Sequence, residues 1–258
     1  MIVREVMTTK LVTVAPDDSL SHAANLFRQY QFHHLPVVQR VHAKGTPLWE
    51  RSSATAKLMF QGLLTSQDID LAAALDQHIQ IGDTAAGGVL HTPWQERRIA
   101  EVMHRALIRV TPTTSVAAAA QILVERGLNC LPVVENEELD IGDQAAEPVT
   151  HTLLVGLLTR SDLLLALARS LGAFEPGMEV IIILPGGDLK PLAQTLQLAS
   201  ELHIPVRSVL AAPLEGSVPR VATLRLGTIN PTPILLHLQQ AQIHYLVGDS
   251  ISEGKTDV

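Results

Sequence analysis

The chain has 258 residues, of which 47% are apolar and 17% charged, a composition typical of two or three globular domains and not of a disordered chain. Its net charge of −7 argues against nucleic acid or an anionic membrane as the main partner. No apolar run approaches the ~18 residues that cross a bilayer, and the single cysteine, Cys130, permits no internal disulfide. We therefore expect a protein of the reducing cytoplasm.

The first predicted elements are a capped helix and a short buried strand. Ser19 and the two aspartates before it offer caps for a helix over residues 20–30, in which apolar residues recur at i, i+4 and i+7. Leu35-Pro36-Val37-Val38 is an apolar run, and the residue before a proline favours extended backbone. Residues 35–38 are therefore predicted to form a strand.

The next element is an apolar strand that passes into a helix at Thr65, with Asp68 three residues further on. One interpretation is a capping box, in which Thr65 caps the helix and the carboxylate reaches back to the amide of the cap residue. The other is a nucleotide site. The free amides of a helix N-terminus favour phosphate, and an aspartate within the first turn can accept hydrogen bonds from ribose hydroxyls. The two interpretations do not exclude each other.

This order of elements occurs twice. The markers are separated by 96 residues in the first part of the unit and by 94 at its end, so a single two-residue slip separates the copies. Such an ordered set indicates a duplication. The paired markers are Met7 and Met103, Pro16 and Pro112, Pro36 and Pro132, Thr65 and Thr159, and Asp68 and Asp162.

The duplicated unit resembles the CBS domain, whose pattern is a V-x-P strand end, an amphipathic helix, an L-P-V-V strand and a G-h-h-T-x-x-D junction, where h is apolar. The resemblance covers roughly residues 1–75 and 98–170. A tandem CBS pair, or Bateman module, typically binds adenosine-containing ligands in the cleft between its repeats. The resemblance implies ligand contacts for Val14, His33, His34, Pro36, Thr65 and Asp68 in the first repeat, and for Val110, Asn129, Cys130, Pro132, Thr159 and Asp162 in the second.

Within that set, the resemblance places His33 and Asn129 nearer the phosphates, and His34 and Cys130 nearer the base. The alternatives are that the two histidines are ordinary surface or packed residues, and that Cys130 is a small buried apolar residue without reactivity. The resemblance implies AMP, ADP or ATP as a regulatory ligand. It implies no catalytic cofactor, and the histidines show no metal-ligand spacing.

Two long insertions depart from the CBS pattern, in which the strand pair turns quickly after L-P-V-V. Residues 39–61 carry a net charge of +3, and residues 135–155 carry a net charge of −6. One expectation is two solvated loops. The alternatives are two loops that attract each other, with Arg40, Lys44, Arg51 and Lys57 facing the acidic cluster of residues 135–143, or a basic loop that folds over the phosphates of a bound nucleotide. Residues 77–97 are predicted to be a linker.

After residue 172 the pattern changes to strand, helix, strand, strand, helix, strand, over residues 179–184, 189–202, 206–210, 218–226, 233–242 and 244–247. This is the order of a ferredoxin-like plait. With its Pro-Gly turn before the first helix, residues 173–250 resemble the ACT domain. ACT domains often bind amino acids near that turn, which implies Gly186, Gly187 and Asp188 as ligand residues. The alternative is a plait used for dimer contacts alone. Residues 251–258 are a predicted tail.

The predicted fold class is therefore α/β (α+β), with CBS repeats over residues 1–76 and 98–172 followed by the plait. This arrangement resembles the acetoin-utilisation regulator type of protein. We expect a ligand-sensing regulator and not an enzyme, since motifs such as H-E-x-x-H, G-x-S-x-G and the P-loop are missing from the sequence. A homodimer is expected, with a possible further protein target. The rival hypotheses are a structural dimerisation module and an enzyme with its site in the plait.

Overall fold

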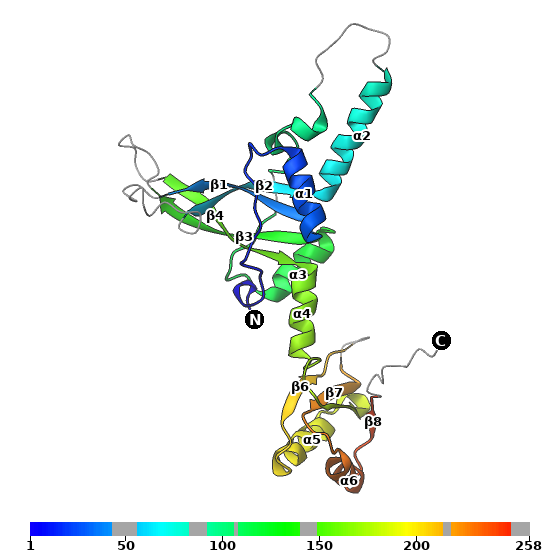
Figure 1. Ribbon diagram of the computed structural model, residues 1–258. Helices are drawn as coiled ribbons and strands as arrows, with labels where there is room; N and C mark the ends of the chain where they lie inside the picture. The colour runs from blue at the N-terminus through cyan, green and yellow to red at the C-terminus, as the bar shows by residue number, and fades with distance from the viewer. Residues whose placement is uncertain (43–55, 83–91, 106–107, 140–148, 214–217, 249–258) are drawn as a thin grey trace. The chain divides into compact units, whose positions relative to one another are not determined.

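The computed structural model describes residues 1–42, 56–82, 92–105, 108–139, 149–213 and 218–248 (Figure 1). The chain divides into two compact units, Met1–Leu163 and Leu164–Val258. Both are mixed α/β structures with a four-stranded sheet, as the sequence predicts. The boundary between them falls within helix α4 (Arg160–Ser170).

The first unit contains the duplicated elements. Its first copy has α1 (Leu20–Tyr30), β1 (His34–Val41), β2 (Lys57–Thr65) and α2 (Ser66–Gly82). Its second copy has α3 (Val116–Glu125), β3 (Cys130–Leu139), β4 (Val149–Thr159) and the start of α4. The four strands form one antiparallel sheet in the order β1-β2-β4-β3, so the hairpins of the two copies meet along β2 and β4, where Met59 is opposite Leu153.

The two copies agree in local detail. Ser19 caps α1 by accepting a hydrogen bond from the His22 amide, and Ser115 caps α3 by accepting one from the Ala118 amide. Both hairpins shift register at the same point, between Val37 and Val38 in one and between Val133 and Val134 in the other. The duplication predicted from the sequence is therefore also a duplication of structure.

The opening segment of each copy packs into the hydrophobic core of the other copy. The first core contains Leu20, Leu35 and Leu64, and Ile99 from the turn that opens the second copy completes it. The second core contains Leu131 and Leu158, and Val3 from the turn η1 (Val3–Glu5) completes it. Val3 and Ile99 are both fully buried. Each copy therefore depends on the other for part of its apolar packing.

Two predictions need correction, the start of the linker and the loop character of the insertions. Helix α2 continues to Gly82, so it enters the predicted linker, and in that linker Trp94 of the 3₁₀ turn η3 (Trp94–Glu96) packs against the first core. The predicted insertions are also not loops throughout. Strands β1 and β2 extend into the first insertion and β3 and β4 into the second, because Val41, Leu139, Leu153 and the partly buried Met59 form a small cluster there. Lys44 and Arg51 lie outside the described residues.

The second unit is the predicted plait. It contains β5 (Met178–Ile183), η5 (Pro185–Gly187), α5 (Lys190–Glu201), β6 (Val206–Leu210), β7 (Val221–Leu226), α6 (Thr232–Gln240) and β8 (Tyr245–Val247). The sheet order β6-β7-β5-β8 places the first and third strands of the unit at the centre, where alternate side chains of β5 and β7 are buried. Ile234 and Leu238 of α6 and Ala199 of α5 pack on them. The order of elements is that of a ferredoxin-like fold, as predicted.

Candidate functional site

Both T-x-x-D junctions form the predicted capping box. The Thr65 amide and hydroxyl donate to Asp68 Oδ2 at 2.8 and 2.7 Å, and the Asp68 amide donates to Thr65 Oγ1 at 3.3 Å. In the second copy the Thr159 amide and hydroxyl both donate to Asp162 Oδ2 at 2.8 Å, and the Asp162 amide donates to Thr159 Oγ1 at 3.1 Å. One oxygen of each carboxylate therefore fixes the start of its helix.

The second oxygen, Oδ1, of each junction aspartate contacts a side chain of the other copy. Thr8 Oγ1 donates to Asp162 Oδ1 at 3.0 Å, and His104 Nε2 lies 2.9 Å from Asp68 Oδ1. Thr8 and His104 occupy equivalent positions, directly after Met7 and Met103. Paired backbone hydrogen bonds join Thr8 to Leu157 and His104 to Leu63 beside these contacts. The two junctions therefore belong to the contact between the repeats.

A cavity of about 410 Å³ opens beside the second junction. This volume is within the range of roughly 300–1,000 Å³ that is typical of small-molecule sites. The lining residues come from both copies: Thr8, Lys10, Leu11, Val12, Gln31, Phe32, His33, His34 and Pro36 from the first, and Asn129, Leu157, Thr159, Arg160 and Ser161 from the second.

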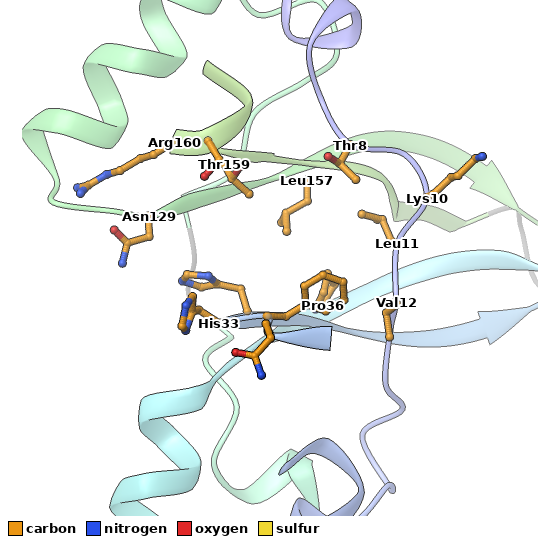
Figure 2. A pocket seen from close by; sticks show the side chains of 14 residues that line it. Thr8, Lys10, Leu11, Val12, His33, Pro36, Asn129, Leu157, Thr159 and Arg160 are labelled. Carbon is orange, nitrogen blue, oxygen red and sulfur yellow. The ribbon is translucent and has the colours of Figure 1, made fainter. Parts of the chain in front are cut away.

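The cavity has a cationic residue at each end and apolar walls between them. Figure 2 shows Arg160, Asn129 and His33 at one end and Lys10 at the other, with Leu157 and Pro36 on facing walls between them. Leu157 is 8% exposed, and Pro36 is buried. Among the described residues that line the cavity, none is acidic. The arrangement therefore suits a ligand with a flat apolar part and an anionic part.

The two adjacent histidines differ in environment. Burial lowers the pKa of His34 below its ordinary value, the neighbouring His33 lowers it further, and Asp68 opposes the shift. His34 is therefore predominantly neutral at pH 7, where it can donate one hydrogen bond and accept another. His33 is exposed, and its carbonyl accepts a hydrogen bond from the Ser66 amide at 3.1 Å.

Five of the predicted ligand residues line this cavity, namely His33, His34, Pro36, Asn129 and Thr159. The other seven do not line it, namely Val14, Thr65, Asp68, Val110, Cys130, Pro132 and Asp162. Val14 and Val110 are buried, and each bridges to the strand of its own copy. Cys130 is 5% exposed, and burial raises the pKa of its thiol to about 12, so it is present as the uncharged thiol. Its role here is that of a small buried residue.

Sequence reasoning missed five polar lining residues, Thr8, Lys10, Gln31, Arg160 and Ser161. Arg160 is one of the two free positions of T-x-x-D, which the pattern leaves open. Thr8 and Lys10 belong to the segment before the first predicted helix. A signal for Thr8 was available, since it follows one of the repeated methionines.

The predicted turn of the second unit has a local structural role. Gly186 and Gly187 have φ angles of 62° and 82°, which favour glycine, and Asp188 Oδ1 accepts a hydrogen bond from the Lys190 amide at 3.0 Å. Asp188 therefore stabilises the start of α5. A hollow in this unit is lined by residues of 239–245 and does not include the turn.

The basic and acidic insertions are joined by one of the ion pairs among the described residues. Lys57 of the basic insertion contacts Glu137 of the acidic one, as predicted. Glu135 pairs instead with Arg4 at 2.9 Å, and Arg40 contacts Thr13 Oγ1 at 3.5 Å. These side chains are exposed, so each pair contributes at most about 1 kcal/mol.

The family model of the CBS domain matches this chain twice, over residues 3–46 and 99–142. The chain therefore contains two CBS domains in tandem, and the matched residues include the L-P-V-V strands of both repeats. The C-terminal plait lies outside both matches. Within the described residues, no helix is long and apolar enough to span a membrane, and no group of acidic, histidine or cysteine residues has the arrangement of a metal site.

Individual relatives match the same part of the chain. The CBS domain-containing protein YhcV of Bacillus subtilis is 26% identical over 161 residues, which cover 61% of this chain and 92% of YhcV. A crystallised Vibrio cholerae protein described as an acetoin utilization protein, AcuB, is 22% identical with a TM-score of 0.43, covering 68% of this chain and 98% of its own. The structure of CBSX2 in complex with AMP is 21% identical with a TM-score of 0.40, covering 64% and 95%.

Proposed function

We propose that this chain is a cytoplasmic regulatory protein that binds an adenine nucleotide, AMP, ADP or ATP, between its CBS domains. The observation that carries the proposal is the cavity at the second junction. Both repeats line it, its walls are apolar at Leu157 and Pro36, and its polar end combines Arg160, Asn129 and His33. A ligand there touches both repeats at once, so its binding energy depends on their relative arrangement.

The proposed orientation follows from the two ends. The adenine base packs between the apolar walls, where the neutral His34 can exchange a hydrogen bond with a ring nitrogen or the amino group. The phosphates lie at the end with Arg160, beside the N-terminus of α4. We place the phosphate beside Thr159, which lines the cavity, and the ribose beside Asp162, which accepts hydrogen bonds from Thr159 but is not itself a lining residue. Thr65 and Asp68 are the corresponding residues of a second site. Asp162 and Asp68 each retain lone pairs for ribose hydroxyls beyond the contacts already described.

The ribose role of the aspartates predicts a loss of affinity that capping alone does not produce. Replacing Asp162 with alanine is expected to weaken nucleotide binding by about 1.5–3 kcal/mol, because a charge-assisted hydrogen bond is lost. Isothermal calorimetry with ATP and AMP measures the change, with Asp68→Ala as the test of the second site. Asp162→Asn is the matched control, since an amide oxygen still accepts the Thr159 hydrogen bonds.

The result distinguishes the two interpretations of the junction. Lower stability of Asp162→Ala and Asp68→Ala without any loss of affinity would leave only the capping box. Loss of affinity in Asp162→Asn as well as in Asp162→Ala supports a contact to the ligand, because asparagine keeps the cap and removes only the charge. Wild-type protein that none of the adenosine ligands stabilises would contradict the proposed function itself, because a ligand at ~100 times its Kd adds roughly 2.7 kcal/mol of stability.

We further propose that occupancy is relayed through a homodimer. The plait supports this proposal because β6 and β8 are edge strands of an open sheet, with Leu210 and Leu246 exposed on them. Light scattering at low micromolar concentration is expected to give twice the chain mass of 27.9 kDa. A single 27.9 kDa species would contradict the dimer. Gly186, Gly187 and Asp188 are the proposed ligand residues of the plait if it is an ACT domain.

A further inference from the structure

Arg160 is held at the polar end of the cavity by two backbone carbonyls. Its own amide donates to the Asn129 carbonyl at 3.1 Å, and its guanidinium Nε donates to the Leu128 carbonyl at 2.8 Å. A guanidinium has five N–H donors in a planar fork, so the Leu128 contact orients the group and leaves its terminal nitrogens for another partner. In the part of the chain that the structure describes, no carboxylate pairs with Arg160.

The neighbours of Arg160 favour an anion. Asn129 and His33 lie beside it at the same end, and both side chains can donate hydrogen bonds (Figure 2). The nearest carboxylate of the junction, Asp162, has both oxygens engaged by Thr159 and Thr8. A guanidinium with amide and imidazole donors, and without an acidic neighbour on the cavity wall, is suited to phosphate oxygens.

The first repeat differs at this position. The residue equivalent to Arg160 is Ser66. At the first junction His104 contacts the Asp68 carboxylate, and at the second junction Thr8 contacts the Asp162 carboxylate. The two junctions are therefore alike in backbone and capping but differ in charge. Of the two T-x-x-D sequences, only the second contains an arginine.

We infer that Arg160 is the residue that makes this cavity selective for phosphorylated adenosine compounds. Affinity then rises with the phosphate charge of the ligand, from adenosine through AMP to ADP and ATP. S-adenosylmethionine, which carries a sulfonium cation and no phosphate, is disfavoured. This inference rests on the proposed function, since it assigns the ligand class of the same cavity.

The test is calorimetry of the full chain with adenosine, AMP, ATP and S-adenosylmethionine at one salt concentration, repeated with Arg160→Ser, which installs the residue of the first repeat. In the wild-type protein we expect ATP and AMP to bind at least about tenfold more tightly than adenosine. Arg160→Ser is expected to weaken ATP binding about 10–100-fold and to leave adenosine affinity within twofold. Arg160→Lys, which keeps the charge without the planar fork, should fall between them.

A matched arginine controls for the lost charge. Arg105 also donates to a backbone carbonyl, that of Ala100, at 3.0 Å, and it does not line the cavity. Arg105→Ser should therefore retain the full preference for phosphorylated ligands. An unchanged preference in Arg160→Ser overturns the inference while adenosine binding upholds the proposed function. An equal loss for adenosine and ATP in both Arg160 variants also overturns it, because Arg160 then acts only on the fold. Absence of binding by every ligand overturns both proposals.

Discussion

Truncating Leu131 to alanine is expected to lower the free energy of unfolding by about 2–5 kcal/mol, because the removed atoms leave a cavity in a closed core. Leu131 is fully buried on β3 and packs with Leu158 and with Val3 from the opening of the other repeat. Leu35 holds the equivalent place on β1 and is also fully buried, so Leu35→Ala should have a similar cost. Chemical denaturation of the two variants measures both values.

The exchange of Val3 and Ile99 adds a second expectation. Each core contains a residue from the other repeat, so Leu35→Ala and Leu131→Ala should lower the same unfolding transition. Ile229, which is 94% exposed, serves as the control, and Ile229→Ala should change stability by no more than about 0.5 kcal/mol. Separate transitions for the two leucine variants would contradict the shared core, and losses below about 1 kcal/mol would contradict the burial.

Much of the fold could be predicted from the sequence because local patterns define its elements. The serine cap and apolar spacing of residues 20–30 are helix signals that depend only on neighbours within a few turns, and the duplication repeats them at residues 116–125. The β-branched run before Pro185 and the order of apolar segments after it are similarly local, and they were enough for the plait. The exchange of Val3 and Ile99 was not predicted, since the contacts join residues that are far apart in the chain and no periodicity encodes them.

The parts of the site that depend on local patterns were also predictable from the sequence, and the contacts between distant segments were not. The repeated T-x-x-D pattern located both capping boxes. The resemblance to the CBS domain pointed to the two residues before L-P-V-V in each repeat, of which His33, His34 and Asn129 line the cavity and Cys130 does not. Thr8 and Arg160 became visible only when the repeats were placed together, because the cavity is built where two distant segments converge. The sequence shows that Thr8 and Arg160 are polar, but it does not show that they line one cavity, because the sheet order β1-β2-β4-β3 brings their two repeats together.

The close approach of the repeats makes Gly62 a sensitive position. A Cβ atom at Gly62 would lie 2.5 Å from the His104 carbonyl oxygen and 3.3 Å from Met103 Sδ. That carbonyl cannot move freely, because it accepts from the Leu63 amide at 3.0 Å, and the His104 amide donates back to Leu63 at 2.9 Å. Gly62→Ala therefore forces the two backbones apart and is expected to cost about 1–3 kcal/mol of unfolding free energy. It should also displace His104 from Asp68.

Gly156 is the equivalent glycine and provides the matched control. There a Cβ atom would meet the flexible end of Met7, at 2.5 Å from Sδ, while the Thr8 carbonyl oxygen is 3.2 Å away. A methionine side chain can change rotamer, whereas a hydrogen-bonded backbone carbonyl cannot, so Gly156→Ala should cost clearly less than Gly62→Ala. Urea denaturation of both variants gives the two free energies. Equal costs, or a larger cost at Gly156, would show that the backbone contact at His104 does not limit how closely the repeats approach.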